Sequence, residues 1–530
     1  MNSRPNILFA FADDWGRYAN VYNEEKGGSP LNKFIDTPTI DKIANEGVIF
    51  TNSLVPAPTC TPCRSSVLSG RYFWQTRLGA ILTGAVWDEN IPTYPKILEK
   101  SGYHTGATYK TWGPGVPFGV PPYGSQEHYY NKSGTTFGGF SHQATRNIRS
   151  GMGVEEAKTP LYEEAKNNFL DFLNNRNGDE PFCYWWGPTN THRTWEKGSG
   201  KELWGLEPDD LKGNMPDFFP DTADVREDVA DYLGECMAYD RGLAAILKEL
   251  EAIGELDNTL IVVSGDHGIP GFPRAKCNLY DIGCEVALMA RLPGVIPEGL
   301  VIDDMTNLMD LAPTFLEVGG CEIPECMVGD SLWKKMCGED TKENEWVITG
   351  RERHVATARE WNLPYPQRAI RTKDFLYIHN FCPDRWPMGF PNGMDDLLTE
   401  PVAWERIVKD TYSVYPDMDA SPTKAWMVHH RAEPEHTSNF LLAFDKRPQE
   451  ELFDLNKDPH QMYNVACGAE YADVKAKIKQ TLMDELHKQR DPRVCDDVVR
   501  YDNSPFTDAF PQAGEEAHAR AEERLSRSGE

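Results

Sequence analysis

Strand-like and helix-like segments alternate through the first half of the chain, and this alternation restricts the fold more than any other feature of the sequence. Continuous apolar strands are predicted at residues 6–12, 182–186 and 260–264. Helices are predicted between them, at 37–47, 94–100 and 228–253, the last with apolar residues at helical spacing up to Gly254. Because strands that alternate with helices form parallel βαβ units, the sequence predicts an α/β fold with a doubly wound sheet.

The pattern changes at about residue 370. Short strands are predicted at 375–379 and 451–455, with Pro-rich loops between them and a helix near 473–487. A chain of 530 residues is also too long for one small core. We therefore predict a large α/β domain over residues 1–369 and a smaller α+β domain over 370–530, whose charged tail from Glu515 onward is a frayed helix or disordered.

The charge balance excludes two classes of partner. The chain carries 82 acidic residues against 54 lysines and arginines, which gives a formal net charge of −28. The average surface field therefore repels nucleic acid and anionic membranes. An anionic substrate must instead be captured by a local cluster of cations.

The sequence gives only weak information on the cellular compartment. No apolar run approaches the ~18 residues that a membrane-spanning helix requires. A strand follows Met1 almost directly, which leaves no room for a signal peptide. The chain as given is expected to be cytoplasmic, or periplasmic or secreted if its N-terminus was trimmed. Its 12 cysteines do not form a small-domain disulfide framework and do not decide the compartment.

Two of the predicted strands end in residues that can bind metal. Asp13 and Asp14 follow the first strand, and Asp266 and His267 follow the strand at 260–264. Open α/β sheets place their ligands beyond the carboxyl ends of the strands, so these side chains can converge on one site. Adjacent carboxylates suit a hard divalent cation such as Ca²⁺.

A second chemical motif starts at Cys60, in the segment Cys60-Thr61-Pro62-Cys63-Arg64. Pro62 is expected to open a helix whose N-terminal amides favour an anion, and Arg64 adds a cation beside it. Taken alone, Cys60 and Cys63 also match a Cys-x-x-Cys redox pair.

The segment from Cys60 to Arg71 resembles the signature of the type I, formylglycine-dependent sulfatases, in which Cys-x-Pro-x-Arg precedes a short apolar helix and a glycine. The resemblance implies an alkaline-phosphatase-like mixed sheet with helices on both faces. It also implies that a formylglycine-generating or sulfatase-maturating enzyme converts Cys60 to formylglycine, whose aldehyde hydrate supplies the nucleophile. In this family the divalent metal, expected to be Ca²⁺, is bound by residues that correspond here to Asp13, Asp14, Cys60, Asp266 and His267.

Further motifs follow in the order found in the family. By resemblance, Arg64, Lys110 and Lys276 belong to the sulfate site, and His192 corresponds to the histidine that protonates the leaving group. Trp112 stands where the family usually has a catalytic histidine, which is the main departure from the pattern.

The subfamily resemblance points to a carbohydrate substrate. Gly268-Ile269-Pro270 and the segment from Asp491 to Cys495 look most similar to the heparan N-sulfatase (N-sulfoglucosamine sulfohydrolase) group, which implies a sulfated saccharide. Arg353, His354 and Arg368 lie where this family places substrate-contacting loops, although a surface ion-pair loop explains these residue types equally well.

Two other functions stay open at the level of sequence. Relatives with the same fold hydrolyse phosphonates or phosphodiesters with formylglycine and a similar metal site. The tryptophan at position 112 also allows a saccharide-binding protein without efficient turnover.

Overall fold

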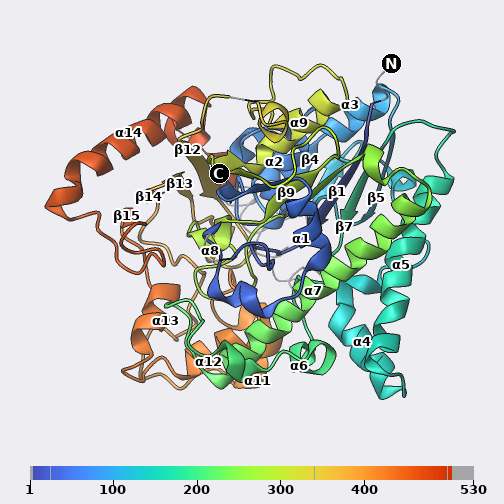
Figure 1. Cartoon of the computed structure of the whole chain (residues 1–530). Coiled ribbons are helices and arrows are strands. Elements are labelled where there is room, and N and C mark those ends of the chain that lie inside the picture. Colours follow the sequence, from blue (N-terminus) through green and yellow to red (C-terminus); the bar gives the residue numbers. More distant parts are fainter. Residues whose placement is uncertain (1–3, 24–25, 340, 498, 504–530) are drawn as a thin grey trace.

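A mixed sheet of seven strands forms the centre of the computed structural model, which describes residues 4–23, 26–339, 341–497 and 499–503 (Figure 1). Its strands lie in the order β10 (Leu300–Ile302), β2 (Val48–Phe50), β9 (Leu288–Arg291), β8 (Thr259–Gly265), β1 (Asn6–Ala12), β7 (Phe182–Gly187) and β5 (His104–Tyr109). β8, β1, β7 and β5 are parallel, whereas β9 runs antiparallel to both of its neighbours. The expected mixed α/β sheet is confirmed.

Helices cover both faces of this sheet. Successive side chains of a strand point to opposite faces, so β1 contributes Leu8, Ala10 and Ala12 to one core and Ile7, Phe9 and Phe11 to the other. The first core is covered by α1 (Pro38–Asn45), α4 (Phe140–Arg149), α5 (Val154–Asn174), α6 (Ser199–Trp204) and α7 (Ala223–Ala252). The second is covered by α2 (Cys60–Ser69), α3 (Tyr94–Lys100), α9 (Leu311–Val318) and α10 (Trp333–Met336).

Most of the predicted elements occupy the expected residues. β1 and α3 match their predicted ranges, β7 is one residue longer at its C-terminal end, and β8 is one residue longer at each end. α7 begins at Ala223, five residues before the predicted start, because its first turn is polar and carries little apolar periodicity. Gly254 follows its end with a φ of 74°, a conformation that glycine adopts without steric cost.

A second, antiparallel sheet lies beside the first and is built mainly from the last third of the chain. It contains β12 (Trp346–Arg351), β13 (Gln367–Thr372), β14 (Phe375–Asn380) and β15 (Glu450–Asp454), and α14 (Ala472–Lys488) packs against it through a third core. Figure 1 shows α14 flanking this sheet at one side of the molecule. β12 precedes residue 370, while the boundary itself stays a prediction. The expected tail from Glu515 lies outside the described residues.

The segment between β14 and β15 returns to the large sheet. Its helices are α11 (Trp404–Lys409), α12 (Pro422–His429) and α13 (Thr437–Phe444), and their apolar side chains join the same core as α7. Apart from short 3₁₀ helices, the other described helices and strands are α8 (Asp281–Cys284), α15 (Pro492–Cys495) and two short strand pairs, β3 (Ser53–Leu54) with β11 (Thr306–Asn307) and β4 (Val86–Asp88) with β6 (Val116–Phe118). This return places residues from the C-terminal part of the chain near the large sheet.

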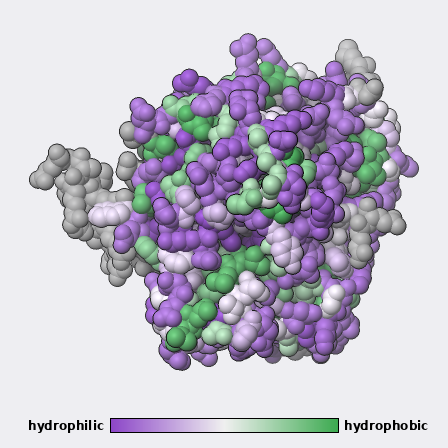
Figure 2. Space-filling view, turned by 90° about the vertical axis from the view of Figure 1, so that its left-hand side faces the viewer, coloured by the Kyte–Doolittle hydropathy of each residue, from purple (hydrophilic) through white to green (hydrophobic). Residues whose placement is uncertain are grey.

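The surface is mainly polar. Hydrophilic residues predominate on the face in Figure 2, with hydrophobic residues in scattered groups. Among the described residues, none of the helices has both the length and the apolar character needed to cross a membrane.

Candidate active site

The carboxyl ends of four neighbouring parallel strands converge on one site. Each strand is followed by polar side chains: β1 by Asp13 and Asp14, β5 by Lys110, β7 by His192, and β8 by Asp266 and His267. The structure thus brings together residues that lie more than 250 positions apart, and the Asp14 backbone N–H donates to Asp266 Oδ1 at 2.8 Å. Asp14 has a φ of 59°, which breaks the alternation of the strand and lets two successive carboxylates face the same site.

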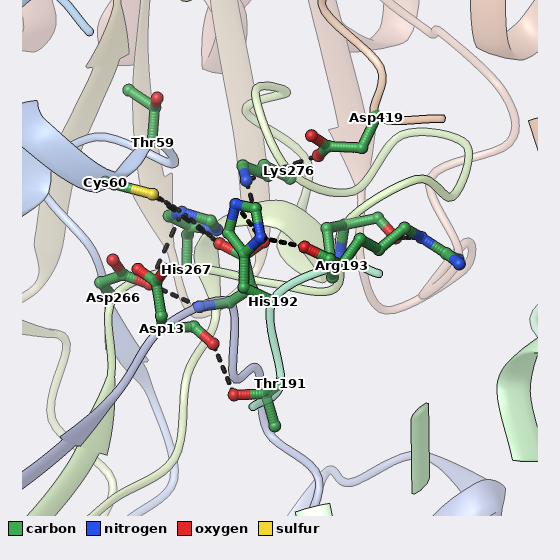
Figure 3. Close-up of polar contacts among 12 residues, drawn as sticks. Asp13, Thr59, Cys60, Thr191, His192, Arg193, Asp266, His267, Lys276 and Asp419 are labelled. Carbon is green, nitrogen blue, oxygen red and sulfur yellow. Dashed lines mark hydrogen bonds and ion pairs between the residues drawn. The ribbon is translucent and has the colours of Figure 1, made fainter. Parts of the chain in front are cut away.

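Cys60 is the first residue of α2 and points into this cluster (Figure 3). Its Sγ lies 3.4 Å from His267 Nε2 and 3.8 Å from Asp14 Oδ1. The helix begins two residues before Pro62, so Cys60 itself sits in the first turn, where the partial positive charge of the helix N-terminus favours a bound anion. Every residue of α2 is buried, which fixes this end of the helix against the sheet.

Arg64 forms ion pairs with two of the carboxylates. Its Nη2 is 3.0 Å from Asp13 Oδ1 and its Nε is 2.8 Å from Asp266 Oδ2, while Nη1 donates to the Lys110 carbonyl at 2.9 Å. The side chain is fully buried. Arg64 therefore orients the acidic groups through a fixed fork of donors.

Two lysines complete the charge pattern. Lys110 Nζ lies 2.8 Å from both oxygens of Asp13, and Lys276 Nζ lies 2.8 Å from Asp14 Oδ2. Burial alone would raise the pKa of Asp13, but the nearby charges of Lys110 and Arg64 hold that pKa well below its usual range. Burial raises the pKa of Asp266, although the charges of His267 and Arg64 oppose the increase.

The donor set fits one divalent cation. Three sets of side chains at this site could each hold a metal ion, because the potential ligand atoms within a set lie within 4.8 Å of one another. The sets are Asp13, Cys60 and Asp266; Asp14, Cys60 and His267; and Asp13, Asp14 and His192. Three buried carboxylates supply hard oxygen ligands, and His267 supplies one nitrogen. The charged partners of these carboxylates in the described structure are Arg64, the two lysines and the two histidines, and side chains of these types also suit an anionic substrate.

His192 faces the same carboxylates from the loop after β7. Its Nδ1 lies 2.5 Å from the Arg193 carbonyl oxygen, which requires the proton on Nδ1 and directs Nε2 toward Asp14 Oδ2, 3.8 Å away. The preceding residue, Thr191, donates its hydroxyl to the Asp13 carbonyl at 2.5 Å. The side chain of His192 is 35% exposed, so it lies at the open side of the cluster.

The three predicted substrate residues have different surroundings, and all are buried. His354 Nδ1 lies 2.6 Å from the hydroxyl of Thr59, the residue before Cys60, and burial lowers the His354 pKa to about 3. Arg353 donates through Nε to the Thr83 carbonyl at 2.9 Å. His354 thus adjoins the site as a neutral group behind Thr59.

Arg368 belongs to a different network. It is paired with Glu352 and Asp491, and its Nη1 donates to two backbone carbonyls. These bonds join β13 to Asp491, the residue that caps the N-terminus of α15, and engage the guanidinium with protein groups. Arg353 and Arg368 are thus both bonded to protein groups, and their contact with substrate stays a prediction.

Trp112 also lies outside the cluster. Its indole N–H donates to Ser65 Oγ at 2.9 Å on the flank of α2, and its ring packs edge-on against Trp87. His267 is the histidine next to Cys60 in this chain.

Sequence reasoning missed one acidic residue at this site. Asp419, from the loop before α12, lies 3.4 Å from Lys276 through Oδ2 (Figure 3). The carboxylate stands more than 140 positions after Lys276 in a segment assigned to the smaller domain, and no spacing or motif connects the two. Only a family motif around Asp419 could have identified this residue from the sequence, and the resemblance included no motif in that segment.

Burial also bears on the redox interpretation of Cys60 and Cys63. Both thiols are buried, and burial raises their pKa values well above the usual range; Asp13 adds to the effect at Cys60 and Asp266 at Cys63. Redox-active Cys-x-x-Cys motifs instead need a lowered thiol pKa. This environment therefore disfavours disulfide exchange.

Comparison with known proteins identifies similar chains. A family model described as Sulfatase matches residues 5–321, which is more than half of the chain. A second, described as N-sulphoglucosamine sulphohydrolase, C-terminal, matches residues 274–413. An ulvan-active sulfatase of Formosa agariphila is 26% identical, over 90% of this chain and 74% of its own length. The N-sulphoglucosamine sulphohydrolase of Homo sapiens is 25% identical, over 95% and 94%.

Solved structures share the architecture. One, determined in complex with its substrate D-glucosamine-2-N,6-O-disulfate, has a TM-score of 0.61 at 19% identity and covers 94% of this chain and 100% of its own. The phosphonate monoester hydrolase of Agrobacterium radiobacter has a TM-score of 0.63 at 16% identity, with 92% and 96% covered. At these identities the likeness shows the fold alone.

Proposed function

Because the chain belongs to the sulfatase family, and is thus a sulfuric ester hydrolase, we propose that it removes sulfate from a sulfated saccharide at the cluster around Cys60. The observation that carries the proposal is the convergence of Cys60 with three buried carboxylates and two lysines at the carboxyl ends of the central strands. The names of two of the relatives specify ulvan and N-sulphoglucosamine, which supports a saccharide as substrate.

Formylglycine and a divalent metal are general features of this family. Asp13, Asp14, Asp266 and His267 would hold the metal next to residue 60, and the oxygen-rich set favours Ca²⁺. When present, the metal draws charge from the sulfate, and formylglycine at residue 60 supplies the attacking hydroxyl. Because Cys60 is only 2% exposed, we propose that a formylglycine-generating enzyme modifies the chain before it folds.

The remaining side chains bind the substrate and move a proton. Lys110 and Lys276 would bind the non-bridging sulfate oxygens, where negative charge grows as the bond to the leaving group breaks. Arg64 keeps Asp13 and Asp266 oriented. His192, exposed at the open side, would donate a proton from Nε2 to the leaving oxygen or nitrogen.

The experiment is to measure release of inorganic sulfate from a panel containing D-glucosamine-2-N,6-O-disulfate, N-acetylglucosamine 6-sulfate and ulvan oligosaccharides, with phenylphosphonate esters in parallel. We expect sulfate release from at least one saccharide, with kcat/KM well above that for the phosphonate. Faster turnover of the phosphonate would favour the other hydrolase activity. Binding of the saccharides without any turnover would indicate a protein that has lost catalysis.

A further inference from the structure

Asp419 is held at the active site by bonds to the loops that carry His192 and Lys276. Two residues after it, Ser421 donates its hydroxyl to the Gly271 carbonyl at 2.7 Å. Thr423 donates its hydroxyl to Asp228 at 2.6 Å, and both oxygens of Asp228 accept from Arg193 at 2.8 Å. Hydrogen bonds to Gly271 and Asp228 therefore hold the start of α12 against the active site, and Asp419 lies directly before it.

The carboxylate of Asp419 lies next to a cation but is not well bonded to it. Lys276 Nζ is 2.8 Å from Asp14 and 3.4 Å from Asp419 Oδ2. That oxygen is buried and accepts no hydrogen bond from any of the described residues. Burial alone would raise the pKa of Asp419, but the charges of Lys276 and other neighbours have the larger effect and hold that pKa well below its usual range. The group is therefore ionised at neutral pH. The neighbouring cations thus stabilise the ionised form, yet none of the described residues donates a hydrogen bond to this oxygen. The side chain as a whole is 18% exposed.

Its place in the site indicates which part of a substrate it faces. In Figure 3, Asp419 lies beyond Lys276 and His192 as seen from Cys60. Sulfate must lie between residue 60 and the lysines, and the leaving atom must lie beside His192. The next group outward is the sugar. A carboxylate directed at sulfate would repel it, whereas a carboxylate directed at the sugar attracts hydrogen-bond donors.

We propose that Asp419 binds the sugar that carries the sulfate, by accepting a hydrogen bond from a hydroxyl or ammonium group adjacent to the sulfated position. This inference rests on the proposed function. It makes Asp419 a specificity residue: it selects substrates with a donor at that place. Aryl sulfates, which have no such donor, gain nothing from it.

The test compares Asp419→Asn and Asp419→Ala with wild type on two substrates. One is the best saccharide of the panel, and the other is 4-nitrophenyl sulfate. Hydrogen bonds to charged groups have the strength to change kcat/KM by roughly 10- to 100-fold. We expect a loss of that size for the saccharide, mainly in KM, and a change of less than about 3-fold for the aryl sulfate. Glu405→Gln, an exposed substitution on α11, is the matched control and should change neither rate.

Two substrate changes identify the donor. N-acetylation of the amino sugar removes an ammonium group, and a deoxy analogue removes a hydroxyl. The analogue that lacks the true donor should lower the wild-type rate as much as Asp419→Ala does, and should have little effect on the variant.

Equal losses on saccharide and aryl sulfate would show that Asp419 only positions Lys276, and would overturn the inference. Unchanged kinetics on both substrates would overturn it as well. Wild-type turnover of aryl sulfate alone, with none of any saccharide, would refute the saccharide assignment together with this inference. Absence of all sulfate release from formylglycine-containing protein would refute the proposed function itself.

Discussion

At the residue scale, the cationic side chains of the site differ in how far they are already bonded to carboxylates of the protein and so in how freely they can bind a substrate. Arg64 donates to Asp13, to Asp266 and to the Lys110 carbonyl, so its contribution is to orient the two carboxylates. Lys110 and Lys276 each contact one carboxylate that would also be a metal ligand. With these carboxylates holding a cation, the two ammonium groups would be available to bind sulfate. His192, whose side chain is 35% exposed, is the most exposed of the predicted catalytic side chains in the described structure.

His192→Ala should affect substrates according to their leaving groups. A sugar alkoxide that departs without a proton is a high-energy anion, whereas nitrophenolate is already stable. General acids typically contribute ~10²- to 10⁴-fold, so we expect a loss of that order for the saccharide and a much smaller one for 4-nitrophenyl sulfate. Steady-state kinetics on the one variant measures both. Equal losses would mean that His192 binds sulfate or maintains structure, and that another group is the acid.

At the element scale, α7 supports the loop that carries His192. Asn190 donates to both the backbone carbonyl and the carboxylate of Glu235, at 2.8 and 3.0 Å, and the Ser141 N–H donates to the same carboxylate. Burial of Glu235 raises its pKa to about 7, against an ordinary value of 4.5. The helix thus holds an acidic group that titrates near neutral pH beneath the active-site loop.

Glu235→Gln should therefore flatten the dependence of stability on pH. Because the pKa of Glu235 is higher in the folded chain, its contribution to stability is fully present below about pH 4.5 and is lost as the pH rises through about 7. The total is roughly 3 kcal/mol over that interval. Thermal melts from pH 5 to 8 should show wild type losing stability relative to the variant. Glu251→Gln, at an exposed position of the same helix, should behave like wild type; parallel melting curves for Glu235→Gln and wild type would contradict the assignment.

The central elements of the sheet could be predicted because their signals are local. β1, β7 and β8 are apolar runs followed by polar residues, and the order of these runs indicates a sheet whose strand ends meet. The antiparallel direction of β9 and the membership of β12 in the small sheet depend on long-range pairing, which no short window of sequence contains. The burial of Arg368 was missed for the same reason: its partner Asp491 lies 123 residues away.

At the scale of the whole molecule, the C-terminal part completes a site that the N-terminal part begins. The N-terminal strands supply Asp13, Lys110, His192 and Asp266, while Asp419 arrives through a segment that joins the core around α7. The order of motifs shared with the family predicted the first group, whereas the position of Asp419 depends on tertiary packing. Arg64 and two lysines gather at this site in a chain whose net charge is −28, which is the local cluster of cations expected for capture of an anion.

Removal of the metal should weaken both stability and activity. A cation that binds only the folded chain stabilises it by mass action, about 2.7 kcal/mol at 100 times its Kd. We expect Ca²⁺ to raise Tm in a concentration-dependent way, and exhaustive chelation to lower Tm and abolish sulfate release until Ca²⁺ is restored. In Asp14→Asn the increase in Tm should be largely absent. Full activity after chelation would refute the metal site.

The central claim is that residue 60, once modified, carries out catalysis, and peptide mass analysis of residue 60 tests it most directly. Preparations made with and without a coexpressed formylglycine-generating enzyme should differ in the fraction of residue 60 whose thiol is replaced by an aldehyde. Sulfate release per molecule should rise in proportion to that fraction and be absent in Cys60→Ala, which should retain the fold. Undiminished sulfate release from protein in which residue 60 is entirely cysteine or alanine would contradict the account.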